Sequence, residues 1–170
     1  FRCVQDDSHS WTEYSALREE EIKEEAERSV EAGVLKKVNT SEWASPAFTI
    51  PKPDGTLQSL SDHRILNKLL KRNPHPLPKI QHILQKLEGF MWATSLDLNM
   101  GFCHVRLSAE LSKLCTVIFP WGNHEHLKLP MRFCNAPGIF QEKMSKLMCD
   151  LEFARAHLAN LLVISTGTHE

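Results

Sequence analysis

Several features that mark familiar classes of protein are missing from this sequence of 170 residues. No apolar run approaches the ~18 residues that a membrane-spanning helix needs, and no signal peptide opens the chain. The five cysteines lack the C-x-x-C spacing of a zinc site, and their odd number disfavours a disulfide framework. No glycine-rich phosphate loop is present. The sequence therefore predicts a protein of a reducing compartment, intracellular (cytoplasmic or nuclear), without a membrane partner.

The sequence does contain enough apolar residues for a core and an uneven distribution of charge. Hydrophobic residues make up 42% of the chain, which is typical of a folded domain. Residues 1–32 carry ten acidic and four basic side chains, whereas residues 33–170 carry eleven acidic and sixteen basic ones. Between His63 and Leu87 there are six basic residues and no acidic one: Arg64, Lys68, Lys71, Arg72, Lys79 and Lys86. Such a stretch can bind phosphates, or it can be a solvated face.

Hydrophobic periodicity and turn residues predict short elements of both kinds. Helices are expected over 15–32, 79–87, 108–113 and 138–152, and a short helical or irregular segment over 61–68. Strands are expected over 34–38, 47–50, 56–61, 93–97, 103–107, 114–119, 124–129, 154–158 and 161–165. Because helices fall between β-hairpins, the predicted fold class is α+β, an antiparallel sheet with helices packed on one face.

The segment Ala93–Phe102 is the centre of the predicted site. Leu96 and Leu98 flank Asp97 on a strand and point to the opposite face, so that a single carboxylate stands where the strand breaks at Gly101. Asp97 can bind a hard cation there, or it can cap a turn. Asn tolerates a left-handed backbone, so Ala159-Asn160 is predicted to be the turn of a β-hairpin. The Asp97 strand and this hairpin are expected to be neighbours in the sheet.

An ordered series of short motifs carries a family resemblance. The chain contains Gly33-Val34-Leu35, Trp43-Ala44-Ser45-Pro46, Lys52-Pro53-Asp54-Gly55, Asp62-His63-Arg64-Ile65-Leu66-Asn67-Lys68, Pro76-Leu77-Pro78-Lys79-Ile80, Ser95-Leu96-Asp97-Leu98, Gly101-Phe102, Leu129-Pro130-Met131, Asn135-Ala136-Pro137 and Phe140-Gln141. The series resembles the reverse transcriptase of Gypsy-type LTR retrotransposon polyproteins from about Ile22 to Ser165. The resemblance implies a right-hand polymerase fold with an irregular end (1–14), a fingers-like region (15–91) and a palm-like region (92–170). The thumb is absent and would lie beyond Glu170.

The resemblance also implies roles for single residues. Asp97 resembles the first palm carboxylate that binds the two Mg²⁺ ions, with the backbone carbonyl of Leu98 as a further ligand. Phe102 resembles the steric gate against a ribose 2′-hydroxyl, and Lys52 resembles the lysine on the triphosphate of the incoming dNTP. These positions imply template-directed nucleotidyl transfer, the activity of an RNA-directed DNA polymerase.

Four further positions imply contact with nucleic acid. Arg64 and Asn67, together with Pro137 and Gln141, resemble residues that hold the template strand or frame the nucleotide pocket. The implied partners are therefore an RNA or DNA template–primer and a dNTP.

The sequence departs from the family at the chemistry itself. The family hairpin reads Tyr-x-Asp-Asp, and here it reads His157-Leu158-Ala159-Asn160. Ala159 has no ligand atom and Asn160 has one neutral amide oxygen, so Asp97 alone cannot neutralise two divalent ions.

Two more departures fall at the expected nucleotide pocket. Gln58 stands where the family usually has an arginine on the triphosphate, and Arg132 stands where a glycine normally lets the backbone approach the nucleotide. The sequence thus predicts a catalytically disabled reverse transcriptase fragment, a pseudoenzyme with weak or lost Mg²⁺ binding. Two alternatives remain open: a non-catalytic nucleic-acid-binding module, and a structural partner subunit of an active polymerase.

Overall fold

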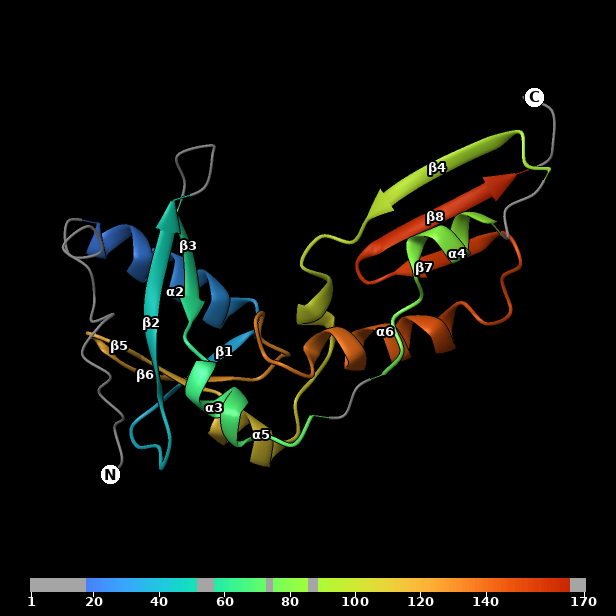
Figure 1. Ribbon diagram of the computed structural model, residues 1–170. Coiled ribbons are helices and arrows are strands. Elements are labelled where there is room, and N and C mark those ends of the chain that lie inside the picture. The colour runs from blue at the N-terminus through green and yellow to red at the C-terminus, as the bar shows by residue number, and fades with distance from the viewer. Residues whose placement is uncertain (1–17, 52–56, 73–74, 86–88, 166–170) are drawn as a thin grey trace. The chain divides into compact units, whose positions relative to one another are not determined.

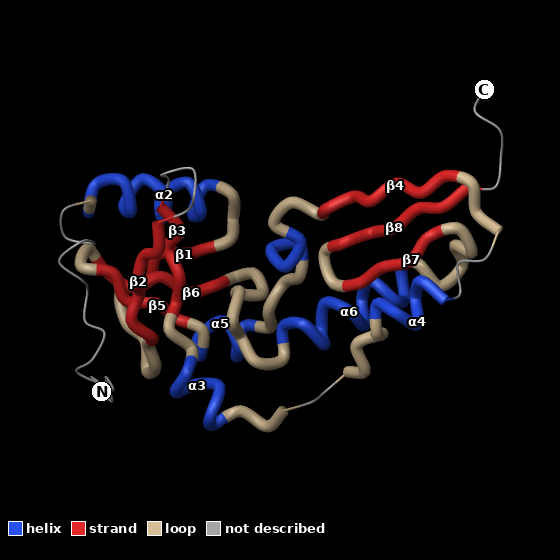
Figure 2. Tube along the Cα trace, turned by 45° about the horizontal axis from the view of Figure 1, so that its top comes forward, coloured by secondary structure: helices blue, strands red, loops and turns tan. Residues whose placement is uncertain are grey.

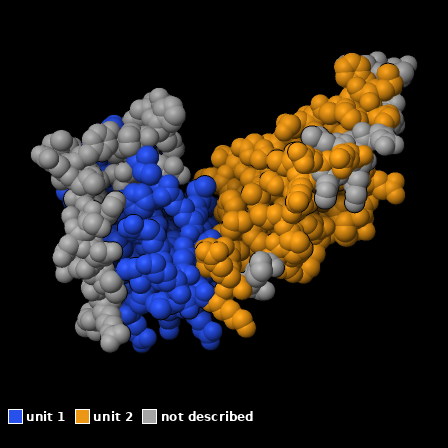
Figure 3. Space-filling view, viewed as in Figure 1, with its two compact units in different colours: residues 1–70, 103–133 blue, residues 71–102, 134–170 orange. Residues whose placement is uncertain are grey.

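The computed structural model describes residues 18–51, 57–72, 75–85 and 89–165 (Figure 1). The chain folds into two compact units, each built from two separate segments (Figure 3). Unit 1 comprises residues 1–70 and 103–133, and unit 2 comprises residues 71–102 and 134–170. Within the described ranges no helix is long and apolar enough to span a bilayer.

Unit 1 contains a five-stranded sheet. Its strands are β1 (Leu35–Val38), β2 (Ser45–Pro51), β3 (Leu57–Ser61), β5 (Thr116–Phe119) and β6 (Gly122–His126), in the spatial order β1-β6-β5-β2-β3. The β2–β3 and β5–β6 pairs are the predicted hairpins, and the tip of the first hairpin lies outside the described residues. The β2–β5 pair is parallel, so this sheet is not purely antiparallel as predicted. A parallel pair is possible here because β2 and β5 are joined by a long connection and not by a tight turn.

Helix α2 (Glu19–Glu31) covers this sheet and confirms the predicted four-residue spacing. Ile22 and Ala26 are buried and Val30 is partly buried against the sheet, while the glutamates between them face solvent. The helix ends as predicted at Gly33, whose φ of +65° suits a residue without Cβ. The shared core of helix and sheet consists of Ile22, Ala26, Leu35, Ala47, Val117 and Phe119.

Two shorter helices complete unit 1. Helix α3 (Arg64–Leu69) follows β3 directly, and helix α5 (Ala109–Leu114) lies beside β6. Ser108 caps α5 as predicted, because its Oγ accepts the N–H of Leu111 at 3.3 Å.

Unit 2 contains a three-stranded antiparallel sheet, formed by β4 (Trp92–Asp97), β7 (Ala154–His157) and β8 (Asn160–Ser165) in the order β4-β8-β7. Helices α6 (Ala136–Leu147) and α4 (Ile80–Gln85) lie along one side of this sheet (Figure 2). Pro137 occupies the first turn of α6, where its missing N–H has no intrahelical partner to lose. Phe140 and Met144 are the predicted apolar positions of α6 that are buried.

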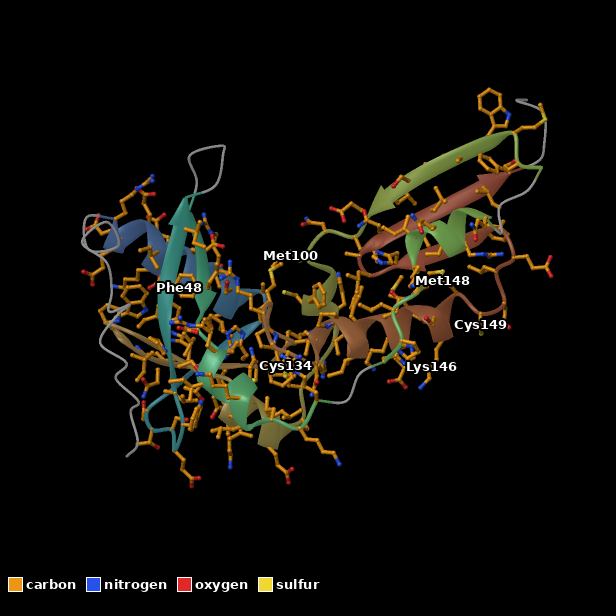
Figure 4. All side chains as sticks on the ribbon, viewed as in Figure 1. Phe48, Met100, Cys134, Lys146, Met148 and Cys149 are labelled. Atoms are coloured by element: carbon orange, nitrogen blue, oxygen red, sulfur yellow. The ribbon has the colours of Figure 1, made fainter. Side chains whose placement is uncertain are left out.

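The sequence prediction for 103–107 is wrong in its first half. The chain forms a short 3₁₀ helix, η1 (Gly101–His104), where a strand was expected. Met100, labelled in Figure 4, turns the backbone with a φ of +51°, and the N–H of Gly101 donates to the carbonyl of Leu98 at 3.1 Å. The chain therefore curls immediately after the β4 strand.

Helix α6 is also shorter than the predicted range 138–152. It ends at Leu147, which is 70% exposed although the pattern placed it on the buried face. Beyond the helix, the Nη1 atom of Arg155 donates to the carbonyls of Leu151 and Glu152 at 3.3 and 2.8 Å. The Arg155 side chain thus supplies hydrogen bonds to these carbonyls where a longer helix is absent.

Candidate functional site

Asp97 and Asn160 lie directly opposite each other in unit 2. Asp97 is the last residue of β4 and Asn160 the first of β8, and the two are register partners in an antiparallel pair. One residue further, the N–H of Leu98 donates to the carbonyl of Ala159 at 2.8 Å. Side chains that are directly opposite in a ladder point to the same face. The predicted adjacency of the Asp97 strand and the hairpin is therefore confirmed.

The hairpin that carries Ala159 turns one residue earlier than the sequence predicted, with the same loop length of two residues. His157 pairs with Asn160, which leaves Leu158 and Ala159 as the two turn residues. The left-handed residue is Leu158, with a φ of +53°, and Asn160 already belongs to β8. The expectation that Asn160 supplies the left-handed turn conformation is thus wrong. The position is set by the register of the ladder, which overrides the local preference of Asn.

The donor set at this corner does not fit a pair of divalent cations. Asp97 is exposed and supplies one carboxylate, Asn160 supplies one neutral amide oxygen, and Ala159 supplies no side-chain donor. Among the residues that the structure describes, no group of three or more His, Cys, Asp or Glu side chains is placed to hold a metal ion. Two Mg²⁺ ions need several anionic oxygens to offset their mutual repulsion, and this corner lacks them.

The side chain of Gln141, in helix α6, forms hydrogen bonds to the backbone of this hairpin. The Gln141 side chain is 1% exposed, and its Oε1 accepts the N–H of Leu158 at 2.7 Å. Its Nε2 donates to the carbonyl of Ala156 at 3.1 Å and to Oγ of Ser145 at 3.2 Å. The contacts to Ala156 and Leu158 lie on either side of His157, where strand β7 enters the turn.

Phe140, the residue before Gln141, packs against the other half of the site. The rings of Phe102 and Phe140 lie 4.8 Å apart, and the Phe102 side chain is half-buried. A Cβ on Gly101 would stand 3.0 Å from Cζ of Phe140 and 3.4 Å from Cβ of Ala159. Only glycine therefore fits between α6 and the hairpin without a local shift.

Unit 1 contains a cavity of about 240 Å³ next to helix α3, lined by Phe48, Ser61, Asp62, His63, Arg64, Asn67 and Arg132. Arg64 forms an ion pair with Asp62, with Nη2 2.6 Å from Oδ2. Hydrogen bonds from the Arg64 guanidinium hold the pKa of the Asp62 carboxyl below its ordinary value of 3.8. The Nδ2 atom of Asn67 donates to the carbonyl of Arg132 at 2.9 Å. The structure thus brings together Arg64, Asn67 and Arg132, three of the predicted site residues.

Arg132 occupies the rim of this cavity in an unusual backbone conformation. Its φ is +66°, a region that residues with a Cβ rarely adopt. Its guanidinium carbon lies 5.4 Å from the ring centroid of Phe48, which Figure 4 labels on β2. The side chain is therefore directed over an aromatic face.

Sequence reasoning missed a histidine pair in the same unit, formed by the buried His63 and the partly buried His126. The rings of His63 and His126 lie 5.9 Å apart, edge to face, and Nε2 of His126 lies 3.0 Å from Oγ of Ser61. His63 is 1% exposed, and its ring nitrogens have no hydrogen-bond partner among the described residues. Burial lowers the pKa of His63 to about 4 and that of His126 to about 3.

The remaining predicted residues are placed only in part. Gln58 lies on β3 and its backbone pairs with Ile50. Pro137 lies in the first turn of α6, and the carbonyl of Leu98, expected to bind metal, accepts the N–H of Gly101. Lys52 lies outside the described residues.

A strand that ends on a carboxylate beside a tight hairpin, over helices on one side of the sheet, is the arrangement of a polymerase palm. A family model described as "Reverse transcriptase (RNA-dependent DNA polymerase)" matches residues 50–162. That match covers well over half of the chain, and the chain belongs to this reverse transcriptase family.

Individual relatives agree with the family. The chain is 26% identical over 157 residues to the retrovirus-related Pol polyprotein from transposon 297 of Drosophila melanogaster, which covers 88% of this chain and 15% of the relative. It is 30% identical over 120 residues to the transposon Tf2-3 polyprotein of Schizosaccharomyces pombe, which covers 71% of this chain and 9% of the relative. The chain thus spans only a small part of these polyproteins.

Solved structures show the same fold. The foamy viral protease-reverse transcriptase dRH in complex with double-stranded DNA matches with a TM-score of 0.79 at 23% identity, over 88% of this chain and 26% of that chain. The foamy viral protease-reverse transcriptase in complex with an RNA/DNA hybrid matches with a TM-score of 0.77 at 22% identity, over 86% of this chain and 20% of that chain. The α+β fold of this chain is that of reverse transcriptase fingers and palm.

Proposed function

We propose that this chain is the fingers-like (15–91) and palm-like (92–170) part of a Gypsy-type LTR retrotransposon reverse transcriptase in which nucleotidyl transfer is disabled. The observation that carries the proposal is the neutral hairpin opposite Asp97. The backbone at this corner supports the proposal, since Asp97 and Asn160 are register partners and the N–H of Leu98 donates to the carbonyl of Ala159. What the hairpin lacks is the negative charge of the two carboxylates that the family has at positions 159 and 160.

The physical reason for inactivity is electrostatic. Phosphoryl and nucleotidyl transfer depend on positioning and on stabilisation of developing negative charge, with little other chemistry for the protein to supply. Removal of a single preorganised electrostatic donor typically raises a barrier by about 3 kcal/mol. Here Ala159 and Asn160 remove both carboxylates that the family places in the hairpin, so the loss exceeds that of one donor.

Two further substitutions, at positions 132 and 58, support the same conclusion. Arg132 brings a bulky cation to the cavity rim where the family has a glycine, and Gln58 replaces a charged fork by a neutral amide. Phe102, whose ring packs on that of Phe140, is proposed as the steric gate against a ribose 2′-hydroxyl. Lys52 is proposed to face the triphosphate of a dNTP.

Retained binding of an RNA or DNA template–primer is the second part of the proposal. Arg64 and Asn67 line one cavity of unit 1, and Arg64 is exposed. Pro137 and Gln141 are proposed to support the template side from helix α6. Because an exposed arginine can contact the phosphates of a nucleic acid of any sequence, Arg64 favours a non-catalytic nucleic-acid-binding module as the alternative function.

A third function, a structural partner subunit of an active polymerase, is favoured by strand β4. All six of its residues are exposed, including Trp92 at 51% and Leu96 at 46%. An exposed edge strand is a common site of association between chains. An intracellular setting, cytoplasmic or nuclear, is part of the proposal and agrees with the free thiols of Cys103 and Cys115.

The proposal is tested by primer extension on an RNA template with Mg²⁺ or Mn²⁺. We expect no template-directed incorporation by this chain, and none after Ala159→Asp with Asn160→Asp, since Gln58 and Arg132 remain. As the matched control, an active full-length reverse transcriptase of the family is given His-Leu-Ala-Asn in place of its Tyr-x-Asp-Asp and is expected to lose extension. Clear synthesis by the unmodified chain would overturn the disabled state.

Binding is measured separately, by fluorescence anisotropy of labelled template–primer over a range of salt concentrations. We expect affinity to fall linearly with salt on a double-logarithmic plot, and Arg64→Gln to reduce the slope by about one. Absence of binding at low salt would remove the nucleic-acid-binding alternative. Size-exclusion chromatography with and without a full-length polymerase tests the subunit alternative.

A further inference from the structure

Helix α6 contacts both halves of the candidate site through two consecutive residues. Phe140 packs on Phe102 and lies against Gly101, in the turn that follows Asp97. Gln141 bonds to the backbone of the hairpin that carries Ala159. One helical turn therefore reaches the strand end and the hairpin at once, and neither contact involves a metal-binding side chain.

The Gln141 contacts fall on backbone atoms rather than side chains. Its Oε1 accepts the N–H of Leu158 and its Nε2 donates to the carbonyl of Ala156, so the amide bridges the residues on either side of His157. The bridge consists of two hydrogen bonds between the Gln141 amide and the backbone, and the Gln141 side chain is buried. Loss of the amide would remove this partner from two partly buried backbone groups, the N–H of Leu158 and the carbonyl of Ala156, and the desolvation cost opposes opening of the bridge.

The residue that Gln141 holds is conformationally strained. Leu158 has a φ of +53°, a left-handed conformation that a leucine adopts only where its surroundings impose it. The bond from Leu158 N–H to Gln141, at 2.7 Å, supplies such a constraint directly. The turn residue and the residue that restrains it come from different elements, β7–β8 and α6.

We propose that Gln141 is the positioning residue of this site: it fixes the Leu158–Ala159 turn so that residue 160 stands opposite Asp97, whatever side chain residue 160 carries. This deepens the proposed function, on which it rests, because it locates the defect in missing charge and not in altered geometry. It follows that carboxylates introduced at positions 159 and 160 would lie next to Asp97 without a change in the backbone of the turn.

The first test uses the chain as it exists. Gln141→Met keeps the volume of the side chain and removes its hydrogen bonds. Amide exchange followed by NMR is expected to speed up at Leu158 by at least about tenfold beyond the change set by global stability. Met144→Ala, a buried substitution in the same helix, is the matched control and is expected to change exchange only in line with its global loss. Gln141→Glu, which keeps an acceptor for Leu158, is expected to retain part of the protection.

The second test uses the carboxylate-restored chain, Ala159→Asp with Asn160→Asp, and Mn²⁺ alone as the probe. Removal of groups that orient metal ligands typically lowers affinity 10- to 100-fold. Addition of Gln141→Met is therefore expected to weaken Mn²⁺ binding by about tenfold or more, whereas Met144→Ala leaves it within a few-fold.

The outcomes separate this inference from the proposed function. Exchange at Leu158 that follows global stability alone in Gln141→Met, or Mn²⁺ affinity that is insensitive to Gln141, would overturn the positioning role. Primer extension by the unmodified chain would overturn the disabled state and leave the exchange result intact.

Discussion

Asp97 and Asn160 face each other across the β4–β8 ladder, and the carbonyl of Ala159 accepts the N–H of Leu98 immediately beyond them. The Asp97 carboxylate thus lies beside the neutral amide of Asn160, at a position where the family has a second carboxylate. The neutral pairing avoids a repulsion that carboxylates at this position would create without bound cations. Stability and metal binding are therefore expected to oppose each other at this corner.

Asn160→Asp is expected to destabilise the metal-free protein by roughly 0.2–1 kcal/mol, because like charges directly opposite in a ladder repel each other. The measurement is urea unfolding at low ionic strength, where screening is weak. The same substitution in an Asp97→Asn background is the control and is expected to have less effect. An equal loss in both backgrounds would show that the two side chains do not interact.

Stability is expected to fall as the pH is lowered from 7 to 4, because of His63. Its pKa is about 4 in the folded protein and near 6.5 when unfolded, so the unfolded chain binds more protons in this interval. The contribution of His63 to stability is thus fully present above pH 6.5 and is lost as the pH falls. The loss approaches about 3 kcal/mol below pH 4. His126, with a folded pKa of about 3, acts in the same direction.

Unfolding free energy measured at a series of pH values tests this expectation, with His63→Phe as the comparison. Phenylalanine retains an aromatic ring beside Phe133, whose ring lies 6.5 Å from that of His63, and it cannot bind a proton. The variant is expected to show a shallower slope between pH 6.5 and 4. A slope as steep as that of the unmodified chain would assign the acid sensitivity to other groups.

Arg132→Gly is expected to be more stable than Arg132→Ala by about 0.5–1 kcal/mol, because Ala keeps a Cβ in the left-handed region and this outweighs the greater freedom of Gly in the unfolded chain. Both variants lack the guanidinium over Phe48, so their difference reports the backbone alone. Chemical denaturation is the measurement. The same pair at Met131, whose φ is negative, is the control and is expected to favour Ala.

Ser108→Ala is expected to lower stability by about 1 kcal/mol, because the N–H of Leu111 loses its acceptor at the start of α5. Ser108→Asp keeps an acceptor at the helix N-terminus and is expected to retain most of the stability. Thermal unfolding of the two variants distinguishes them. Equal losses in both would mean that the cap does not contribute.

Much of the fold could be predicted because its signals are local. The spacing of Ile22, Ala26 and Val30 specified one face of α2, and Gly33 marked its end. Ser108 marked the start of α5. Where the prediction failed, a distant contact decided the outcome: η1 replaces a strand where Gly101 packs under Phe140.

The candidate site divides in the same way. The motif around Asp97 and the substituted hairpin could be recognised in the sequence, since each is a run of consecutive residues. The pair of His63 and His126 could not, because 63 positions separate the two residues along the chain and only the tertiary structure brings their rings together.

The amino-acid sequence by itself determined the family, the alternation of helices and hairpins, and the loss of the hairpin carboxylates, because these depend on residue types and their local spacing. The tertiary structure decided that Asn160 stands opposite Asp97, that Leu158 takes the left-handed conformation, and that Gln141 holds the turn. The physical reason is that register and burial arise from contacts between elements remote in sequence, and these contacts override the preference of any single residue.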